Sequence, residues 1–496
     1  MRKILLLLAC CLLLVSCRSS EGRKQVQTLK DLSGAVIGVQ LGTTSDVLAT
    51  ELEKKGDGTH VERFTKGADA VQSLRQGKID CMVTDEAPAK AFQRVTPSLY
   101  ILPQTFDKSD FAICVAKKNS ALLGEINAAL KALKDKGVID RIVDRHMVKH
   151  QAVAYEWKGS TKNGCRKIRF ATNATFEPFE YYDGGKIVGI DVDVAHAIGD
   201  QMGVGVEIVD VEFDAIIASV QTGKIDAGIA GITVTPERQK NISFTDTYAC
   251  EKQVVVVDRS GSVTEMKEVG LVDKFKACFI VDGRYLYLLQ GLGNTLLITL
   301  FSIVLSMMLG TLIAIVRATH DSQGTHRVLN AFCQVYLSVV RGTPTMVQLL
   351  IIYYVVFASA DVNKLLVAVI AFGLNSAAYV AEVIRSGIIS VDRGQMEGGR
   401  SLGLSYSKTM RLIILPQAFK NVLPALGNEL ITLLKETSIS GYIGVVDLTK
   451  GSDIIRSITY EAMLPLGIVA AIYFLIVVGL YRIVRQLEKF MRKGER

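Results

Sequence analysis

Two charged residues in separate stretches of this 496-residue chain are suited to hold the two ends of an α-amino acid. Arg238 lies in GITVTPERQKNISFTD, and its guanidinium offers two parallel donors at a fixed charge, which match a carboxylate. Asp85, in MVTDEAPA, would supply the counter-charge for an ammonium, since a buried aspartate needs such a partner. Two simpler interpretations stay open: Arg238 as a surface arginine, and Asp85 as a helix cap, because nearby Pro88 suits a first helical turn.

The elements that would position these residues recur along the chain. Gly-Lys-Ile-Asp occurs at residues 77–80, in QSLRQGKIDCMVTD, and again at 223–226, in ASVQTGKIDAGIAG. In both copies a helix that ends at glycine is expected to run into a buried strand. We therefore expect two similar α/β lobes, which is the plan of a clamshell that closes on a small molecule.

Residues 28–257 resemble the periplasmic binding proteins for polar amino acids, especially the glutamine-binding type. The resemblance implies that Arg238 binds the ligand's carboxylate and that Asp85 binds its ammonium from the other lobe. It also implies contacts from Thr233 and the backbone of Gly231 to the ammonium, from the turn of Gly42, Thr43 and Thr44 to the carboxylate, and from Phe176 and Phe213 to the ligand's side chain. An isolated phenylalanine is usually a core residue, so that interpretation also stays open.

Two departures from the glutamine-binding pattern bear on the identity of the ligand. Asn173 stands where the family has an aspartate, and Gln40 stands where it has a lysine. Both changes remove a charge. They favour a neutral polar ligand such as glutamine over arginine or lysine.

The two segments stand in the reverse of the family's order, because its first segment resembles residues 167–258 and its second resembles residues 28–146. The predicted domains are 28–146, the second lobe with a C-terminal return to the first lobe; 147–167, a linker; 168–257, the first lobe; and 258–285, a linker. Either the clamshell is circularly permuted, or two tandem binding domains have lost their middle; pairing of lobes between two chains is also compatible. In the permuted form the break falls in a hinge strand, so we expect one crossing between the lobes, near residues 106–116.

Residues 397–416, EGGRSLGLSYSKTMRLIILP, form a glycine-rich, basic, helix-forming stretch between apolar spans, which indicates a docking surface. The spacing resembles the EAA loop of prokaryotic ABC importer permeases, which implies that an ATPase binds here. The matching positions are Glu397, Gly398, Gly399, Gly403, Ile413, Leu415 and Pro416. Gly398 and Gly399 replace alanines, and each should weaken the first helix by about 1 kcal/mol. The alternative is an ordinary cytoplasmic loop with a proline-ended helix.

The chain is 49% hydrophobic yet 21% charged, and its apolar part is concentrated in residues 286–490. Five stretches there approach the ~20 residues that a membrane-crossing helix needs. They are 296–316, 346–357 extended on both sides, 365–383, 425–446 and 464–484. Lysine and arginine gather after Tyr481 and in the 397–416 loop, so both face the cytoplasm and the binding lobes face outside. The predicted fold class is a two-lobed α/β periplasmic-binding-protein (type II, clamshell) domain followed by an all-α transmembrane ABC type I permease domain.

Several charged residues lie at or within these spans, where charge is expensive. They are Glu382, Arg385, Glu429, Lys435 and Glu436. They either line the translocation path or reach from helix ends to the membrane surface.

The first 17 residues have the pattern of an export signal. Arg2 and Lys3 precede an apolar run over residues 4–15 that is too short to span a membrane. The following Leu14-Val15-Ser16-Cys17 resembles a lipoprotein signal, which implies acylation of Cys17. An ordinary signal peptide with a coincidental cysteine is the alternative. The other exported cysteines are odd in number and irregularly spaced, so they predict no disulfide framework.

Missing motifs complete the prediction. The sequence has no GxxxxGK[ST] phosphate loop, so a separate ABC ATPase must hydrolyse ATP. One permease region implies a homodimer or a paired permease. No motif indicates a cofactor, a metal site, a nucleic-acid site or an enzyme. We predict a subunit of an amino-acid ABC importer of the histidine/glutamine type, with a substrate-binding protein fused to a multi-pass permease in the bacterial inner membrane. The alternative is a ligand-gated channel with a glutamate-receptor-like clamshell, but its pore lies between the lobes, whereas all spans here follow both lobes.

Overall fold

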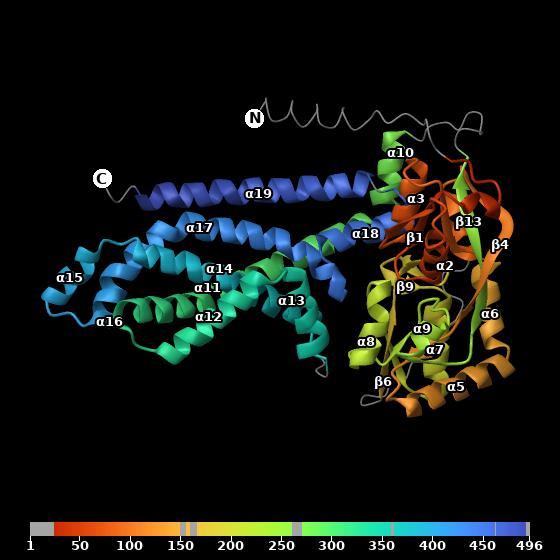
Figure 1. Cartoon of the computed structure of the whole chain (residues 1–496), viewed down its shortest axis with the longest axis horizontal. Helices are drawn as coiled ribbons and strands as arrows, with labels where there is room; N and C mark the ends of the chain where they lie inside the picture. The colour runs from red at the N-terminus through yellow and green to blue at the C-terminus, as the bar shows by residue number, and fades with distance from the viewer. Residues whose placement is uncertain are drawn as a thin grey trace. The chain divides into compact units, whose positions relative to one another are not determined.

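A computed structural model of the chain describes residues 24–148, 155–158, 166–259, 270–358, 362–461 and 463–492 (Figure 1). The chain divides into two compact units, Met1–Asp110 with Ala249–Lys267, and Phe111–Tyr248 with Glu268–Arg496. The α/β part of the first unit corresponds to the predicted second lobe, and we keep that name for it. Residues 111–248 of the other unit are called the first lobe, and residues 270–492 are called the permease part. The predicted signal peptide and Cys17 lie outside the described residues.

The second lobe is a five-stranded sheet with helices. Its elements are η1 (Leu29–Leu32), β1 (Val36–Gln40), α2 (Thr44–Glu53), β2 (His60–Phe64), α3 (Gly67–Arg75), β3 (Cys81–Asp85), α4 (Glu86–Val95), β4 (Leu99–Phe111) and β13 (Ala249–Asp258). The strand order is β2-β1-β3-β13-β4, with β1 parallel to β2 and β3, and β13 antiparallel to β3. All five residues of β3 are buried, because a strand in the middle of a sheet with packed faces has no solvent side.

The first lobe has a five-stranded sheet of its own and a small three-stranded sheet, β7-β8-β9. Its elements are β5 (Cys114–Val115), α5 (Ser120–Asp135), α6 (Val138–Met147), β6 (Lys167–Thr172), β7 (Thr175–Phe176), β8 (Glu180–Asp183), β9 (Lys186–Val188), α7 (Ile190–Met202), β10 (Gly205–Asp210), η2 (Phe213–Ala215), α8 (Ile216–Thr222), β11 (Ala227–Gly228), α9 (Pro236–Gln239) and β12 (Ser243–Phe244). The strand order is β10-β6-β11-β5-β12, with β6 parallel to β10 and β11, and β5 antiparallel to β11.

The two Gly-Lys-Ile-Asp copies occupy equivalent places in the two sheets, as the sequence predicts. Gly77 and Gly223 both have positive φ, at +69° and +80°, the conformation in which glycine ends a helix most easily. Each copy then turns into the third strand of its sheet, where its aspartate accepts a bond from the neighbouring strand. Asp80 Oδ2 lies 2.8 Å from the backbone nitrogen of Val36, and Asp226 Oδ2 lies 2.8 Å from that of Arg169.

The predicted single crossing between the lobes is wrong. The chain passes from one unit to the other at Asp110–Phe111 and again at Tyr248–Ala249. Strand β13, predicted as the end of the first lobe, instead pairs with β3 and buries Val254 to Val257 in the second lobe. Strand β5, which follows the second lobe in sequence, lies in the first lobe's sheet. Each sheet therefore contains a strand from the other half of the sequence, so residues 28–146 and 167–258 are not two separately folded domains.

The permease part is helical. Its elements are α10 (Leu271–Phe275), η3 (Lys276–Ile280), η4 (Val281–Gly283), α11 (Tyr285–Gln323), α12 (Arg327–Gly342), α13 (Thr345–Ile351), η5 (Ile352–Val356), α14 (Lys364–Ile389), α15 (Arg393–Ser401), α16 (Tyr406–Thr409), η6 (Met410–Ile414), α17 (Leu415–Glu436), η7 (Thr437–Ile443), α18 (Leu448–Thr459) and α19 (Met463–Arg492). Helices α11, α14, α17 and α19 run side by side (Figure 1). Ala314, Val380 and Val422, one from each of the first three of these helices, meet in a buried apolar cluster.

Three helices among the described residues are long and apolar enough to cross a membrane: α11, α14 and α19. They confirm three of the five predicted spans. The second predicted span is a pair, α12 and α13 with η5, bent by 111° at Thr343–Pro344, where proline cannot continue a helix. The fourth, 425–446, is displaced. Helix α17 begins at Leu415, carries Lys420, Glu429, Lys435 and Glu436, and does not satisfy the same criteria.

Candidate functional site

The turn after β1 carries three of the predicted ligand residues. Gly42 has φ +75°, and its N–H donates to Asp46 Oδ2 at 3.0 Å. Thr43 caps α2, accepting from the backbone nitrogen of Asp46 and donating to the carbonyl of Gln40 at 2.7 Å. The buried hydroxyl of Thr44 has no hydrogen-bond partner in the described part of the chain. Since a buried polar group left alone is costly, Thr44 is the member of this turn best placed to bind a ligand.

Asp85 ends β3 and stands at the N-cap position of α4, yet its side chain makes no capping bond. Its Oδ1 instead accepts from Gln253 Nε2 at 2.9 Å. Burial, and then repulsion from Glu251, raise the pKa of Asp85 to about 7. Asp85 has no ion-pair partner among the residues that the structure describes. The helix-cap interpretation therefore does not account for Asp85, and a carboxylate without a cation suits a ligand's ammonium.

Gln253 joins Asp85 to the Thr43–Thr44 turn, and the sequence analysis did not identify it. Its Nε2 also donates to Ser109 Oγ at 2.9 Å, and its Oε1 accepts a short bond from Ser45, the residue after Thr44. Gln253 is 1% exposed. Gln253 lies far in sequence from its partners Asp85, Ser109 and Ser45, so no local spacing connects them.

Arg238 lies in the first lobe on the single turn α9, which Thr235 caps. Its Nη1 donates to the carbonyl of Thr233 at 2.7 Å, and its guanidinium carbon lies 5.7 Å from the ring centre of Phe213. Burial lowers the pKa of the guanidinium from its usual value. The structure thus brings Arg238, Thr233 and Phe213 together around a desolvated cation, which strengthens the case against a surface arginine.

Gly231 and Phe176 form a second group in the first lobe. A Cβ on Gly231 would lie 3.1 Å from the ring of Phe176, so the backbone and the ring are in close contact. The N–H of Gly231 donates to Asp191 Oδ2 at 2.7 Å, and Tyr248 donates to the other oxygen at 2.8 Å. Asp191 is fully buried, and burial chiefly raises its pKa to about 6. The sequence analysis missed Asp191, although an aspartate beside the apolar residues of GIDVDVAHAI is a usable signal.

Asn173 is buried and its amide is already engaged. Nδ2 donates to the carbonyl of Val211 at 2.9 Å, and Oδ1 accepts from Thr175 Oγ1 at 2.8 Å. A ligand contact by Asn173 would have to replace one of these bonds. Gln40 Nε2 donates to the carbonyl of Thr65 at 3.3 Å.

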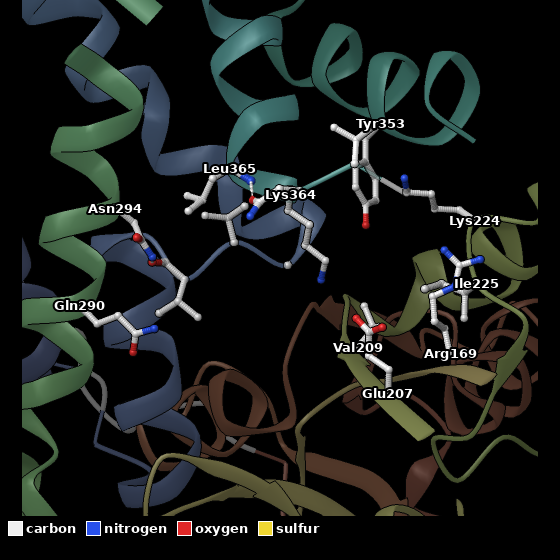
Figure 2. Close-up of a pocket in the computed structure, with 15 residues that line it drawn as sticks. Arg169, Glu207, Val209, Lys224, Ile225, Gln290, Asn294, Tyr353, Lys364 and Leu365 are labelled. Atoms are coloured by element: carbon white, nitrogen blue, oxygen red, sulfur yellow. Dashed lines mark hydrogen bonds between the residues drawn. The ribbon is translucent and has the colours of Figure 1, made fainter. Parts of the chain in front are cut away.

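The end of β10 contacts the permease part through a buried lysine. Lys450 of α18 lies 3.1 Å from Asp210 Oδ2 and 3.2 Å from Glu212 Oε1. Burial opposes the charge of Lys450, but the two carboxylates outweigh it and raise its pKa above the usual value. A polar cavity of about 370 Å³ lies beside this contact, lined in part by Arg169 and Lys364 (Figure 2).

The charged residues of the permease part fall into two groups. Glu429 and Glu436 line a cavity of about 160 Å³ together with polar side chains that include Asn375 and Ser376. Glu382 instead forms ion pairs with Arg317 and with Arg385, the latter at 3.1 Å. Polar groups facing a cavity are the arrangement expected of a translocation path, and Glu382 with its two arginines also lines a cavity, of about 600 Å³.

The predicted ATPase-coupling loop folds as α15, α16 and η6, before α17. Glu397, Gly398 and Gly403 are exposed, as a docking surface requires, and Pro416 begins α17. Gly403 has φ +86°, and the N–H groups of Gly403 and Leu404 close the end of α15. Gly399 is buried against Thr409 and Ile413, and Leu415 packs in the same cluster.

No group of three or more His, Cys, Asp or Glu residues suited to a metal ion occurs in the described part of the chain. The cysteines that the structure describes are free thiols, three of them buried: Cys81, Cys114 and Cys278.

Comparisons with known proteins match both parts of the chain. The model of the bacterial extracellular solute-binding proteins, family 3, matches residues 168–462. The chain is 37% identical over 210 residues to a putative glutamine transport system permease protein of Rickettsia typhi, covering 42% of this chain and 94% of that protein. It is also 37% identical over 211 residues to an arginine transport system permease protein of Bacillus subtilis, with coverages of 42% and 94%. A crystal structure of an amino acid ABC transporter with histidines is similar to this chain, with 37% sequence identity and a TM-score of 0.40. The matched region covers 45% of this chain and 99% of the chain in that structure.

Proposed function

We infer the function from membership of two families: this chain belongs to the family 3 bacterial extracellular solute-binding proteins and to the permease subunits of amino-acid ABC transporters. It is a transport protein and not an enzyme. It lies in the inner membrane with its solute-binding part on the extracytoplasmic side, and a separate ABC ATPase supplies the energy. What we propose beyond this is the ligand, the residues that bind it, and the assembly.

The proposed ligand is one L-amino acid, held as a zwitterion. The observation that carries this proposal is a pair of groups of opposite charge, the buried Asp85, which has no ion-pair partner among the described residues, and the half-buried Arg238. A carboxylate without a cation suits an ammonium, and a guanidinium suits a carboxylate by two parallel bonds. Thr44 and Thr233 would add neutral contacts, and Phe176 and Phe213 would contact the side chain.

Glutamine or another neutral polar amino acid fits best. Asn173 and Gln40 stand where charged residues stand in the glutamine-binding pattern, and the amide of Asn173 is already satisfied within the lobe. Of the two relatives, one is named for glutamine and one for arginine. Neutral groups at both positions give no electrostatic reason to prefer a cationic ligand.

A thermal-shift screen of the full chain in detergent against the twenty amino acids tests the ligand. We expect L-glutamine or another neutral polar amino acid to raise the melting temperature, because a ligand that binds only the folded state stabilises it. If no amino acid raises it, the proposed ligand class is wrong. If arginine or lysine gives the largest shift, the argument from Asn173 and Gln40 is wrong.

We propose that the 397–416 loop transmits ATP-driven motion to the permease. Gly403→Glu should abolish transport and ATPase association, because it places a bulky acidic side chain at an exposed turn with φ +86°. Binding of the amino acid should survive. Gly479→Ala in α19, which would meet no atom within 4 Å, is the matched control. Normal uptake by the Gly403 variant would refute the assignment of the loop.

The proposed assembly is a homodimer, or a pair with a second permease, anchored by an acylated Cys17. Native mass spectrometry of the complex with its ATPase should count two copies of this chain; one copy with another permease would replace the homodimer. Acyl labelling should be lost in Cys17→Ser, and label that persists there would exclude lipidation at Cys17.

A further inference from the structure

Two segments that carry candidate ligand residues meet at one carboxylate in the first lobe. One is residues 173–176, which follows β6, and the other is residues 210–213, at the end of β10. Asp210 Oδ1 accepts from the backbone nitrogen of Ala174 at 3.0 Å, so Asp210 ties the first segment to the second. A displacement of either segment by a ligand therefore acts on Asp210.

The other oxygen of Asp210 is held from the permease part. Lys450 Nζ lies 3.1 Å from Asp210 Oδ2 and 3.2 Å from Glu212 Oε1. Tyr182 also donates to Asp210 Oδ2, at 3.2 Å. The side chain of Lys450 is 3% exposed, and those of its two carboxylate partners are 6% and 11% exposed, so little water screens these interactions.

The same contact is closely packed along the backbone. A Cβ on Gly444, in the turn before α18, would lie 2.3 Å from the carbonyl oxygen of Asp210. Gly185 donates its N–H to the hydroxyl of Tyr287 on α11 at 2.9 Å. Lys224 Nζ donates to the carbonyl of Phe357 at 2.9 Å. Lys450 is therefore one part of a continuous surface between the first lobe and the permease part, and it is one of two buried lysines there, the other being Lys224.

A lone buried lysine between two carboxylates is poor evidence for stability, because desolvation offsets much of the attraction. The strength of the attraction between the lysine and its carboxylates depends steeply on geometry, however, since the interaction of a charged pair in a dry site weakens as its atoms separate. Such a contact responds to small shifts of the segments that it joins.

We propose that Lys450 is a positioning residue for amino-acid import, which holds the ligand-bearing segments 173–176 and 210–213 through Asp210 and Glu212 and reports their occupancy to the permease through α18. This inference rests on the proposed function, because it requires that these segments contact an amino acid. Lys450 itself touches no ligand.

The test uses the full chain in nanodiscs and combines calorimetry with hydrogen exchange, with L-glutamine as the first probe and then whichever amino acid gives the largest thermal shift. In the natural chain the amino acid should slow exchange in α18, residues 448–459, as well as in the lobes. Lys450→Gln should abolish that slowing in α18 and weaken binding by about ten-fold, since a buried charge pair has lost its cation. Arg456→Gln, on the same helix and at an arginine ion-paired with Asp453 three residues away, should leave both readouts unchanged.

A charge exchange separates positioning from mere loss of structure. Lys450→Glu combined with Glu212→Lys should restore the slowing in α18, whereas either reversal alone should not. A folded double variant that restores nothing would overturn the proposal. It would also be overturned by a Lys450→Gln variant that keeps both readouts, or by a natural chain that binds the amino acid without any change in α18. A natural chain that binds no amino acid at all would instead refute the proposed function.

Discussion

Two buried aspartates, one in each α/β lobe, end strands of sheets that are built alike, but they differ in their partners. Asp85 ends β3 in the second lobe, is 8% exposed, and accepts a bond from Gln253. Asp210 ends β10 in the first lobe, is 7% exposed, and is paired with Lys450. Burial without a cation raises the pKa of Asp85 to about 7, whereas Asp210 has an ion-pair partner, Lys450, at 3.1 Å.

The difference indicates which charges are free for a ligand. The carboxylate of the first lobe is already neutralised from within the chain, and the candidate ligand group of that lobe is a cation, Arg238. The carboxylate of the second lobe lacks a cation, and an amino acid's ammonium would provide it. The two lobes would thus contribute opposite charges to a zwitterion, and the first three of the following predictions test that division.

The largest expected effect is on Arg238. Arg238→Ala should weaken amino-acid binding by about 3 kcal/mol, roughly a hundred-fold in Kd, because it leaves a desolvated carboxylate without its donors. Isothermal titration measures it. Arg166→Ala, which removes an exposed arginine paired with Glu125, is the control and should bind normally. Equal affinity in both variants would mean that the first lobe's charged ligand group lies elsewhere.

Replacing Asp85 should weaken binding less than replacing Arg238 does, and its effect on stability should be opposite to that of replacing Asp210. Asp85→Asn keeps an oxygen that can accept from Gln253 but removes the counter-charge, so binding should weaken by about 2 kcal/mol. The ligand-free protein should be no less stable at pH 8, since an unpaired buried charge has gone. Asp210→Asn should lower the melting temperature, because Lys450 loses a buried partner. If Asp85→Asn destabilises as Asp210→Asn does, the comparison fails.

The pH dependence follows from the raised pKa of Asp85. Its folded value is about 7 against an ordinary value of 3.8, so between these two pH values the folded state holds more protons than the unfolded state. The contribution of Asp85 to stability is therefore fully present below pH 3.8 and is lost as the pH rises to about 7. The slope of the free energy of unfolding against pH is at most about 1.4 kcal/mol per pH unit. Melting of the natural chain minus that of Asp85→Asn isolates this slope. A difference that is flat or rises with pH would show that Asp85 is not held as a neutral acid.

The smallest expected effects are on the stability of the proposed coupling loop. They concern two adjacent glycines, at which the neighbouring atoms decide whether an alanine stabilises or destabilises the loop. A Cβ at Gly398 would meet nothing within 4 Å, so Gly398→Ala should stabilise α15 by about 1 kcal/mol. A Cβ at Gly399 would lie 2.5 Å from Thr409 Cγ2, so Gly399→Ala should destabilise the loop by roughly 1 kcal/mol. Hydrogen exchange over residues 393–414 compares the two. Changes of the same sign would mean that helix propensity alone governs this segment.

Local patterns were enough for several features. The two Gly-Lys-Ile-Asp copies, with glycine at a helix end and aspartate before a strand, predicted two similar lobes, and the hydropathy of α11, α14 and α19 predicted three spans. The proposed coupling loop was predicted from the spacing of its glycines and its final proline. These features depend on residues close together in sequence, where type and spacing carry the information.

Features that depend on distant partners were missed. The sequence assigned β13 to the first lobe, but three of its buried valines, Val254 to Val256, pair with β3. The sequence analysis did not identify Gln253, Asp191 or Lys450, because their partners lie far away in the chain. The bend before α13 was overlooked because an apolar run is the same whether the helix is straight or broken.

The sequence by itself determined that this chain has α/β lobes and membrane helices, because periodicity, hydropathy and short motifs act over a few turns of chain. Only the tertiary structure decided which aspartate keeps a lysine and which does not, and which strand completes which sheet. The physical reason is that charge pairing in a dry interior and strand pairing are set by groups that meet only after folding.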